Sequence, residues 1–238
     1  MPHPRFLVDV PLAGPGEYDL DRQESHHAAT VLRLRAGDEA IVFDGRGGHA
    51  HAVLVHVGKN GVRVRAEDAH QDARQPVRLT IASAIPKGKR WQTLVEKCTE
   101  LGADRIIPLL TERSVAKGEG DAVKWRRWAI EAAKQCRRTW LPEIREPVRL
   151  ADVPALAESE GAVLLLADRG GDAPPQCRER VVRAGGAVAL IGPEGGLSDG
   201  ELAYCRDRGA LGIALSPFVL RVETAAAVMC AFMRETGL

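Results

Sequence analysis

This chain of 238 residues lacks paired cysteines and long apolar runs. Its five cysteines are widely spaced and form no C-x-x-C pair, which argues against a disulfide framework and against a zinc site. The N-terminal segment MPHPRFLVDVPLAGPG has no continuous apolar stretch, and no run approaches the roughly 20 apolar residues of a membrane span. We therefore expect a cytoplasmic protein with no membrane partner.

Aromatic residues are scarce, and histidines are absent from most of the chain. Aromatics make up 4% of the residues, which argues against a protein that coats single-stranded RNA by stacking on its bases. All seven histidines precede residue 71, so the rest of the chain has no histidine base. His49 and His51 would share one face of a strand and could bind a metal, but no further ligand pattern surrounds them. We interpret them as surface residues and expect no metal.

Positive charge is concentrated in the middle of the chain. The net charge is only +1, yet residues 75–150 contain 16 lysines and arginines against 9 aspartates and glutamates. A basic segment between acidic flanks is expected where one face of a protein follows phosphates. The alternative is a solvated helix surface with no nucleic-acid partner.

Residues 1–73 have the pattern of a small β-barrel domain. Short or alternating apolar runs predict strands at 40–43, 51–57 and 61–64, and Asn60-Gly61 is a strong hairpin signal. Residues 26–34 form the one expected helix. A polar stretch ending in Pro76 follows, and we place the domain boundary at residues 73/74.

Residues 74–238 alternate strands with helices, which predicts an α/β fold with a mostly parallel sheet covered on both faces. We expect strands at 78–84, 106–110, 163–167, 188–191 and 211–215, and helices at 91–101, 122–138 and 225–233.

The segment AVALIGPEGGLSDGE, residues 187–201, combines an apolar strand, a glycine-rich turn and a helix start. The glycines allow a sharp turn and a close approach of the backbone to a ligand. Ser198 and Glu201 have the spacing of a capping box, so a helix should begin there. The loop has neither the G-x-G-x-x-G spacing nor the G-K-[ST] ending of common nucleotide sites, which indicates a different ligand.

A second strand, loop and helix follow at residues 211–233. The helix is apolar on nearly all sides and should be buried. In open parallel sheets, ligands bind beyond the carboxyl ends of the strands. We therefore expect the loops that follow residues 191 and 215 to share one pocket.

The motifs IGPEGG (191–196) and LRVETAA (220–226) resemble the cofactor signature of the SPOUT methyltransferases and, more narrowly, of the RsmE family. Segments 26–48, 84–114 and 131–144 resemble the same family in order, so the resemblance covers nearly the whole chain. The sequence departs from the family pattern at Ser216, where a glycine is usual, and at Phe218, where an arginine is usual.

This resemblance implies a fold, a reaction and partners. The first domain would be a PUA-like RNA-binding β-barrel, and the second a SPOUT domain with a C-terminal trefoil knot, assembled as a homodimer. The implied reaction is methylation of the N3 nitrogen of a uridine in 16S ribosomal RNA, within the assembled small subunit. The implied cofactor is S-adenosyl-L-methionine.

We expect the cofactor to contact both motif loops. The expected cofactor-binding residues are Leu166, Ile191, Gly192, Pro193, Glu194, Gly195, Gly196, Leu215, Ser216, Leu220, Arg221, Thr224 and Ala225. Methylation at N3 also requires the loss of a weakly acidic proton. Arg221 would stabilise the resulting anion, and Glu223 or Glu194 would accept the proton. The alternative is that Arg221 and Glu223 only pair with each other at the last helix, where Thr224 is the expected N-cap.

A glycine among three cations at residues 87–90 favours contact with an RNA backbone. The expected RNA-binding residues are Arg33, Arg35, Lys87, Lys89, Arg90, Arg113, Arg137 and Arg138. Ordinary solvated surface is the alternative interpretation of these charges.

Two other functions remain open. One is a SPOUT methyltransferase that acts on another RNA site, although the long resemblance outside the pocket argues against it. The other is a catalytically silent RNA-binding factor of ribosome assembly, which Ser216 and Phe218 keep open. Only a methyltransferase has a reason to bind the cofactor tightly.

Overall fold

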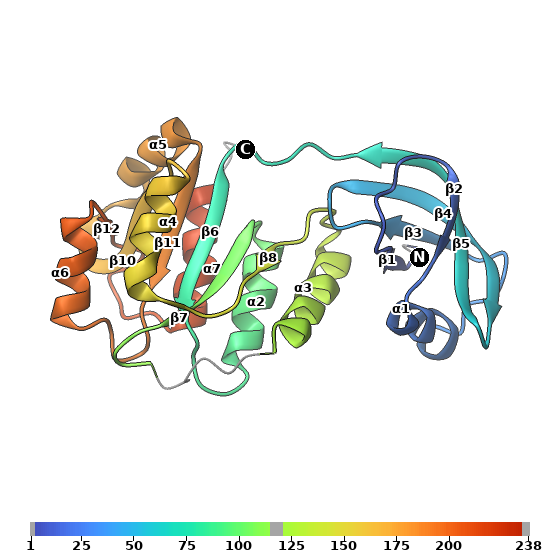
Figure 1. Cartoon of the computed structure of the whole chain (residues 1–238), viewed down its shortest axis with the longest axis horizontal. Coiled ribbons are helices and arrows are strands. Elements are labelled where there is room, and N and C mark those ends of the chain that lie inside the picture. The colour runs from blue at the N-terminus through green and yellow to red at the C-terminus, as the bar shows by residue number, and fades with distance from the viewer. Residues whose placement is uncertain (1–2, 115–120, 235–238) are drawn as a thin grey trace. The chain divides into compact units, whose positions relative to one another are not determined.

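The computed structural model describes residues 3–114 and 121–234, and the chain divides into two compact units (Figure 1). The first unit contains residues 1–74 and 133–141, and the second contains residues 75–132 and 142–238. Each unit has its own apolar core. None of the described helices has the length and apolar character that crossing a membrane requires.

The first unit is a five-stranded sheet with one short helix. Its elements are β1 (Arg5–Leu7), β2 (Gly16–Asp19), α1 (Arg22–His26) with a π-helical turn (His27–Val31), β3 (Glu39–Phe43), β4 (Gly48–Gly58) and β5 (Gly61–Gln71). The strand order is β1-β3-β4-β5-β2, and only the β1–β3 pair is parallel. Alternate side chains face a core that includes Phe6, Val42, Leu54 and Val64.

The hairpin expected at Asn60-Gly61 joins β4 to β5. Gly58 pairs with Gly61, and Gly61 has a φ of +116°, which glycine adopts without strain. The sequence does not predict β1 and β2, because three or four residues are too few to show an alternation. The helix begins at Arg22 rather than at residue 26, because the side chain of Asp21 accepts the N–H of Glu24 at 2.7 Å and caps it there.

Residues 133–141 pack with the first unit, although the sequence places them in the second domain. Lys134 Nζ lies 3.0 Å from Glu24 Oε1, and these side chains are only 8% and 5% exposed. The Thr139 hydroxyl donates to Asp72 at 2.6 Å. These partners are far apart in the sequence, so a linear boundary does not reveal them.

The second unit is an α/β layered fold. Its strands are β6 (Arg78–Ala84), β7 (Arg105–Leu110), β8 (Glu143–Ile144), β9 (Val148–Arg149), β10 (Val163–Asp172), β11 (Gly186–Ile191) and β12 (Leu211–Ile213). Its helices are α2 (Arg90–Glu100), α3 (Ala122–Cys136), which ends in the first unit, α4 (Val153–Ser159) after a 3-10 turn (Leu150–Asp152), α5 (Pro174–Ala184), α6 (Asp199–Asp207) and α7 (Val222–Arg234). The strand order is β12-β10-β11-β6-β7-β8, with β9 also beside β7, and all pairs are parallel. The expected parallel sheet is confirmed, but the sequence pattern does not predict α4, α5 or the short strands β8 and β9.

Helices cover both faces of this sheet. In β11, Ala189 and Ile191 join the core that contains α2, α3, α5 and α7, whereas Val188 and Leu190 join the core that contains α4 and α6. A strand buried on both faces needs apolar residues at every position. This explains the continuous apolar run before the glycine-rich loop.

β11 and β12 end beside the middle of β10 at one edge of the sheet. Leu166 of β10 pairs with Leu190 of β11, and Ala167 of β10 pairs with Ile213 of β12. Further along β10, a Cβ on Gly171 would lie 2.2 Å from the carbonyl carbon of Gly212, so only glycine fits there. This edge brings together the two loops that the sequence predicts to share a pocket.

Candidate functional site

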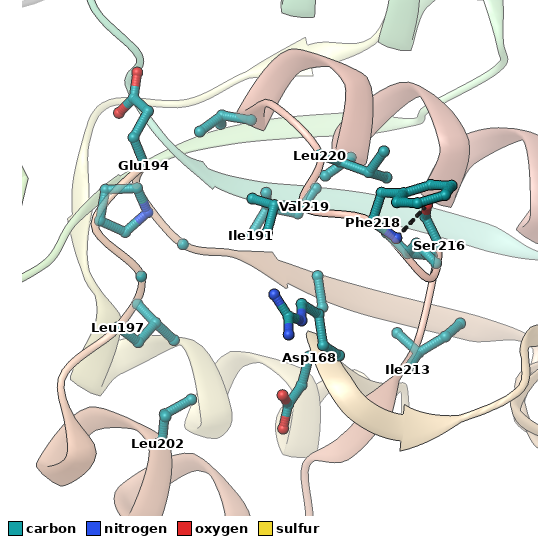
Figure 2. A pocket seen from close by; sticks show the side chains of 18 residues that line it. Asp168, Ile191, Glu194, Leu197, Leu202, Ile213, Ser216, Phe218, Val219 and Leu220 are labelled. Carbon is teal, nitrogen blue, oxygen red and sulfur yellow. Dashed lines mark hydrogen bonds between the residues drawn. The ribbon is translucent and has the colours of Figure 1, made fainter.

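A pocket of about 400 Å³ lies at the carboxyl ends of β11 and β12, beside the middle of β10 (Figure 2). Ile191 and Ile213 contribute from the ends of β11 and β12, and Ala167 contributes from the middle of β10. Val222 and Ala225 contribute from α7. The two motif loops therefore share one pocket, as the sequence predicts. Its size lies within the roughly 300–1,000 Å³ of small-molecule sites.

Most of the expected cofactor residues lie on the pocket wall, namely Ile191, Gly192, Pro193, Glu194, Gly196, Leu215, Ser216, Leu220 and Ala225. Leu166 does not, because strand alternation directs it into the core with α4 and α6 while the next residue reaches the pocket. Gly195 is also not part of the pocket wall. A Cβ added at Gly195 would lie nearest to the side chain of Arg113. Arg221 and Thr224 are exposed outside the wall.

Other residues of the wall are not predicted from the sequence, namely Ala167, Asp168, Arg169, Leu197, Leu202, Ile213, Phe218, Val219 and Val222. Asp168 is the carboxylate among them. Its Oδ2 accepts from Arg206 at 2.6 Å, and its Oδ1 accepts from the backbone of Gly170 at 3.2 Å. Burial alone would raise the pKa of Asp168, but these hydrogen bonds and the arginine charge together hold that pKa below its ordinary value. Asp168 follows the apolar run 163–167 directly, and a carboxylate at the end of such a run is a sequence signal that would have found it.

The glycine-rich loop is fixed at its end by the predicted capping box. Ser198 accepts from the N–H of Glu201 at 3.2 Å, and Glu201 Oε2 accepts from the N–H of Ser198 at 2.8 Å, so the capping box is confirmed. The other oxygen of Glu201 accepts from the N–H of Glu112 at 2.9 Å. One buried glutamate thus ties the start of α6 to the segment after β7.

Arg113, the next residue of the same segment, holds the glycine-rich loop through its side chain. Its Nη1 donates to the carbonyl of Gly195 at 2.9 Å and to that of Leu197 at 3.3 Å. A guanidinium that donates to two carbonyls fixes the path of the backbone between them. The structure therefore gives Arg113 a contact with the loop, and its contact with RNA stays a prediction.

An ion pair joins the start of α2 to the pocket wall. Arg90 Nη1 lies 3.2 Å from Glu194 Oε1, and the two side chains are 35% and 36% exposed. Figure 2 shows the carboxylate of Glu194 pointing away from the centre of the pocket. An expected RNA-binding residue and an expected catalytic residue are therefore in direct contact.

Arg221 and Glu223 do not pair with each other within the described residues, so the interpretation of both as an ion pair is not supported. Arg221 is exposed, whereas one carboxylate oxygen of Glu223 is buried without a hydrogen-bond partner in that part of the chain. α7 begins at Val222, so Thr224 lies inside the helix and the prediction that it is the N-cap is wrong.

Ser216 and Phe218, the two departures from the family pattern, are in contact. Ser216 Oγ accepts from the N–H of Phe218 at 3.1 Å and closes a tight turn on the pocket wall (Figure 2). The Phe218 side chain is 77% exposed, and the neighbouring Val219 is 74% exposed. The loop thus presents two apolar side chains to its surroundings.

The remaining expected RNA-binding residues are distributed over both units. In the second unit, Lys87 and Lys89 are exposed just before α2. In the first unit, Arg33, Arg35 and Arg137 are exposed and Arg138 is half-buried. Arg33 and Arg137 have φ values of +56° and +62°, a left-handed conformation that is unusual outside glycine.

Comparisons with known proteins agree with this geometry. Residues 73–234 match the family described as RNA methyltransferase domain, and residues 20–67 match the RNA methyltransferase PUA domain. The chain is 35% identical over 225 residues to ribosomal RNA small subunit methyltransferase E of Mycobacterium tuberculosis, covering 88% of this chain and 82% of the relative. It is 33% identical to the Synechocystis protein of the same name, covering 89% and 71%.

Solved structures give the same result. The Neisseria gonorrhoeae ribosomal RNA small subunit methyltransferase E bound to S-adenosyl methionine has a TM-score of 0.88 and 25% identity, covering 98% of this chain and 97% of its own. A methyltransferase of Legionella pneumophila with bound cofactor SAM has a TM-score of 0.85 and 29% identity, covering 98% of both chains.

Proposed function

The chain belongs to the ribosomal RNA small subunit methyltransferase E family, and on that premise we propose that it methylates the N3 nitrogen of a uridine in 16S ribosomal RNA. It is an RNA methyltransferase that uses S-adenosyl-L-methionine. The observation that carries the proposal is the pocket at the ends of β11 and β12, where the two motif loops meet.

The residues of the pocket fit this cofactor, which combines an adenosine with a methionine part. Leu197, Leu202 and Leu220 supply apolar wall, while Gly192 and Gly196 leave the backbone accessible. Asp168, held ionised by Arg206, is suited to accept hydrogen bonds from ribose hydroxyls or from an ammonium group. When bound, the cofactor supplies an electrophilic methyl group on a sulfonium.

The chain's own residues then need to orient the uridine, exclude water and remove one proton. The transfer forms a carbon–nitrogen bond, breaks a carbon–sulfur bond and releases the N3 proton to a base. Glu194 is the expected catalytic carboxylate that lies on the pocket wall. Its carboxylate pairs with Arg90 and points away from the pocket centre, so we assign it the proton once that pair opens, directly or through a water. Arg221 would stabilise the imide anion from its exposed position, and Glu223 is the alternative acceptor.

RNA binding in this proposal uses the basic residues around the pocket. Lys87, Lys89 and Arg90 border the start of α2, and Arg90 touches the pocket wall through Glu194. Phosphates bound there would position the strand for chemistry without reading its sequence. We propose the assembled small subunit as the substrate, and this places the protein in the cytoplasm.

A homodimer is a further part of the proposal. Phe218 and Val219 are large apolar side chains, and their exposure beside the pocket supports contact with a second copy of the chain. Phe218→Asp should then give a monomer with reduced activity, measured by light scattering at micromolar concentration. A wild-type chain that is monomeric and fully active would refute the dimer. The trefoil knot stays a prediction from the family resemblance.

Two measurements test the proposed function. Calorimetry should show micromolar binding of S-adenosyl-L-methionine, because a silent assembly factor has no reason to retain it. Mass spectrometry of 16S ribosomal RNA from a deletion strain should show one uridine without its N3 methyl group, restored by the cloned gene. Loss of a methyl group from another RNA instead would favour a different SPOUT specificity.

A further inference from the structure

A second cavity lies in the first unit and is lined by basic side chains. They are His3, Arg5, His49, His51, His70 and Arg137. From the sequence, His49 and His51 are expected only as surface residues or metal ligands, and no sequence pattern marks Arg5. All six belong to the same unit, so the cavity is complete within it.

The sheet register explains why these side chains converge. In β1, Arg5 alternates with the core residue Phe6 and therefore lies on the face opposite the core. His51 lies on that face one strand beyond Ile41, which pairs with Arg5. His49 pairs directly with His70, and their ring centroids are 5.6 Å apart. Three strands, β1, β4 and β5, thus present basic groups on one face.

Arg5 carries a charge that nothing in the described part of the chain pairs with directly. Its Nε and Nη2 atoms are buried without a hydrogen-bond partner, and its guanidinium lies 5.4 Å from the centre of the Phe43 ring. Burial lowers the pKa of Arg5, and the charge of Arg137 lowers it further. Burying a cation without a partner costs desolvation free energy. An anionic ligand that paired with Arg5 would offset this cost.

Arg137 approaches the same cavity from the segment after α3. Its φ of +62° is a conformation that glycine adopts freely and that strains other residues. A glycine here would fit the backbone better but would remove the positive charge. Backbone preference therefore does not explain why an arginine occupies this position, whereas a role for its positive charge does.

The carboxylates near the cavity are already engaged. Asp72 lies 3.6 Å from His49 Nδ1 and accepts from Thr139 at 2.6 Å, and Glu39 lies 3.4 Å from His3. A metal is a poor occupant, because two arginines would repel it and no group of three possible ligands exists among the described residues. The chemistry fits an oxyanion with several acceptor oxygens.

We propose that this cavity binds a backbone phosphate of the RNA substrate, with Arg5 and Arg137 supplying the charge and the imidazoles supplying further donors. The inference rests on the proposed function, since an RNA must be the ligand. In this proposal the first unit binds one phosphate of the RNA, and the second unit methylates a uridine of the same RNA.

The test uses the full chain and a fluorescent fragment of 16S RNA, with binding measured by anisotropy at several salt concentrations. Arg5→Gln and Arg137→Gln should each weaken binding about tenfold and lower the slope of log affinity against log salt by about one. The control is Arg65→Gln, an exposed arginine of β5 that pairs with Glu17 at 2.8 Å, and it should change binding less than about twofold. Affinity for S-adenosyl-L-methionine should be unchanged in all three.

Arg137→Gly separates a ligand role from a structural one. It relieves the left-handed strain, so its melting temperature should be equal to or higher than that of the wild type while its RNA affinity falls. This variant also keeps the test valid if Arg5→Gln does not fold. Folded variants with wild-type affinity and salt slope would overturn the proposal.

Two further measurements distinguish a failure of the phosphate site from a failure of the proposed function. Tight binding of inorganic phosphate by the wild type, together with unchanged RNA binding by the variants, would make the cavity a site for a free anion and overturn the RNA assignment. Wild-type methylation of small subunits is measured in parallel. No methylation by the wild type would refute the proposed function, whereas wild-type methylation with unaffected variants would refute only the phosphate site.

Discussion

Arg90 and Glu194 form an ion pair, with Nη1 and Oε1 3.2 Å apart, that links the basic start of α2 to the wall of the proposed cofactor pocket. Both side chains are about one-third exposed, and pairs of this kind contribute at most about 1 kcal/mol. An RNA phosphate could therefore replace Glu194 as the ion-pair partner of Arg90 with little loss of free energy. The carboxylate of Glu194 would then be released. Binding of RNA would then prepare the group to which we assign the proton.

Glu194→Gln tests that role. The amide cannot accept the N3 proton, so the single-turnover rate of methyl transfer should fall by at least about tenfold, while cofactor affinity stays within a few-fold of the wild type. The control is Glu112→Gln, an exposed glutamate beside Arg113, which should leave the rate unchanged. A wild-type rate for Glu194→Gln would mean that Glu194 is not the proton acceptor and would leave Glu223 as the candidate.

Arg221→Lys tests the stabilisation of the anion. Because Arg221 has no ion pair with Glu223, the variant should keep the melting temperature of the wild type and its RNA affinity. Its methylation rate should fall, and raising the pH should restore part of the loss because more of the uridine imide is then ionised. A defect in stability with no recovery at high pH would indicate a structural role.

Gly196→Ala and Gly195→Ala form a matched pair in the glycine-rich loop. Gly196 has a φ of +71°, and an alanine there strains this loop conformation by about 1 kcal/mol. Because the unliganded loop would relax to relieve the strain and the cofactor would have to restore it, cofactor affinity should fall by roughly fivefold. Gly195 has no such φ, and a Cβ there would lie at an ordinary 3.7 Å from Arg113 Cδ. Calorimetry should therefore find Gly195→Ala close to the wild type. Equal affinities for the two variants would contradict the assigned loop conformation.

Asp168→Asn tests the carboxylate of the pocket wall that is not predicted from the sequence. The pKa of Asp168 is lowered in the folded state, so its ion pair with Arg206 contributes stability above the ordinary carboxyl pKa of about 3.9 and loses it as the pH falls through the lower folded value. Asp168 therefore stays charged between pH 6 and 8. The variant should bind the cofactor about tenfold more weakly at every pH in that range. Arg206→Gln, which keeps the carboxylate, should lose less. An unchanged affinity of Asp168→Asn would remove Asp168 from the cofactor site.

The sequence alone determines the layers of the second unit and the position of its pocket. Continuous apolar runs such as residues 188–191 require burial on both faces, and the Ser198–Glu201 spacing sets the start of α6, because both signals act over a few neighbouring residues. Ligands of such sheets bind at the carboxyl ends of the strands, so the two motif loops are predictable as neighbours.

Tertiary structure decides what depends on residues that are distant in the chain. It places Arg113 on the carbonyl of Gly195, pairs Arg90 with Glu194, and brings residues 133–141 into the first unit. It also gathers Arg5 with three histidines from β4 and β5 on one face of a sheet. These contacts cannot be predicted from sequence spacing, because strand order and register determine them. The sequence around a single charged residue also does not indicate which distant residue will contact it in the folded protein.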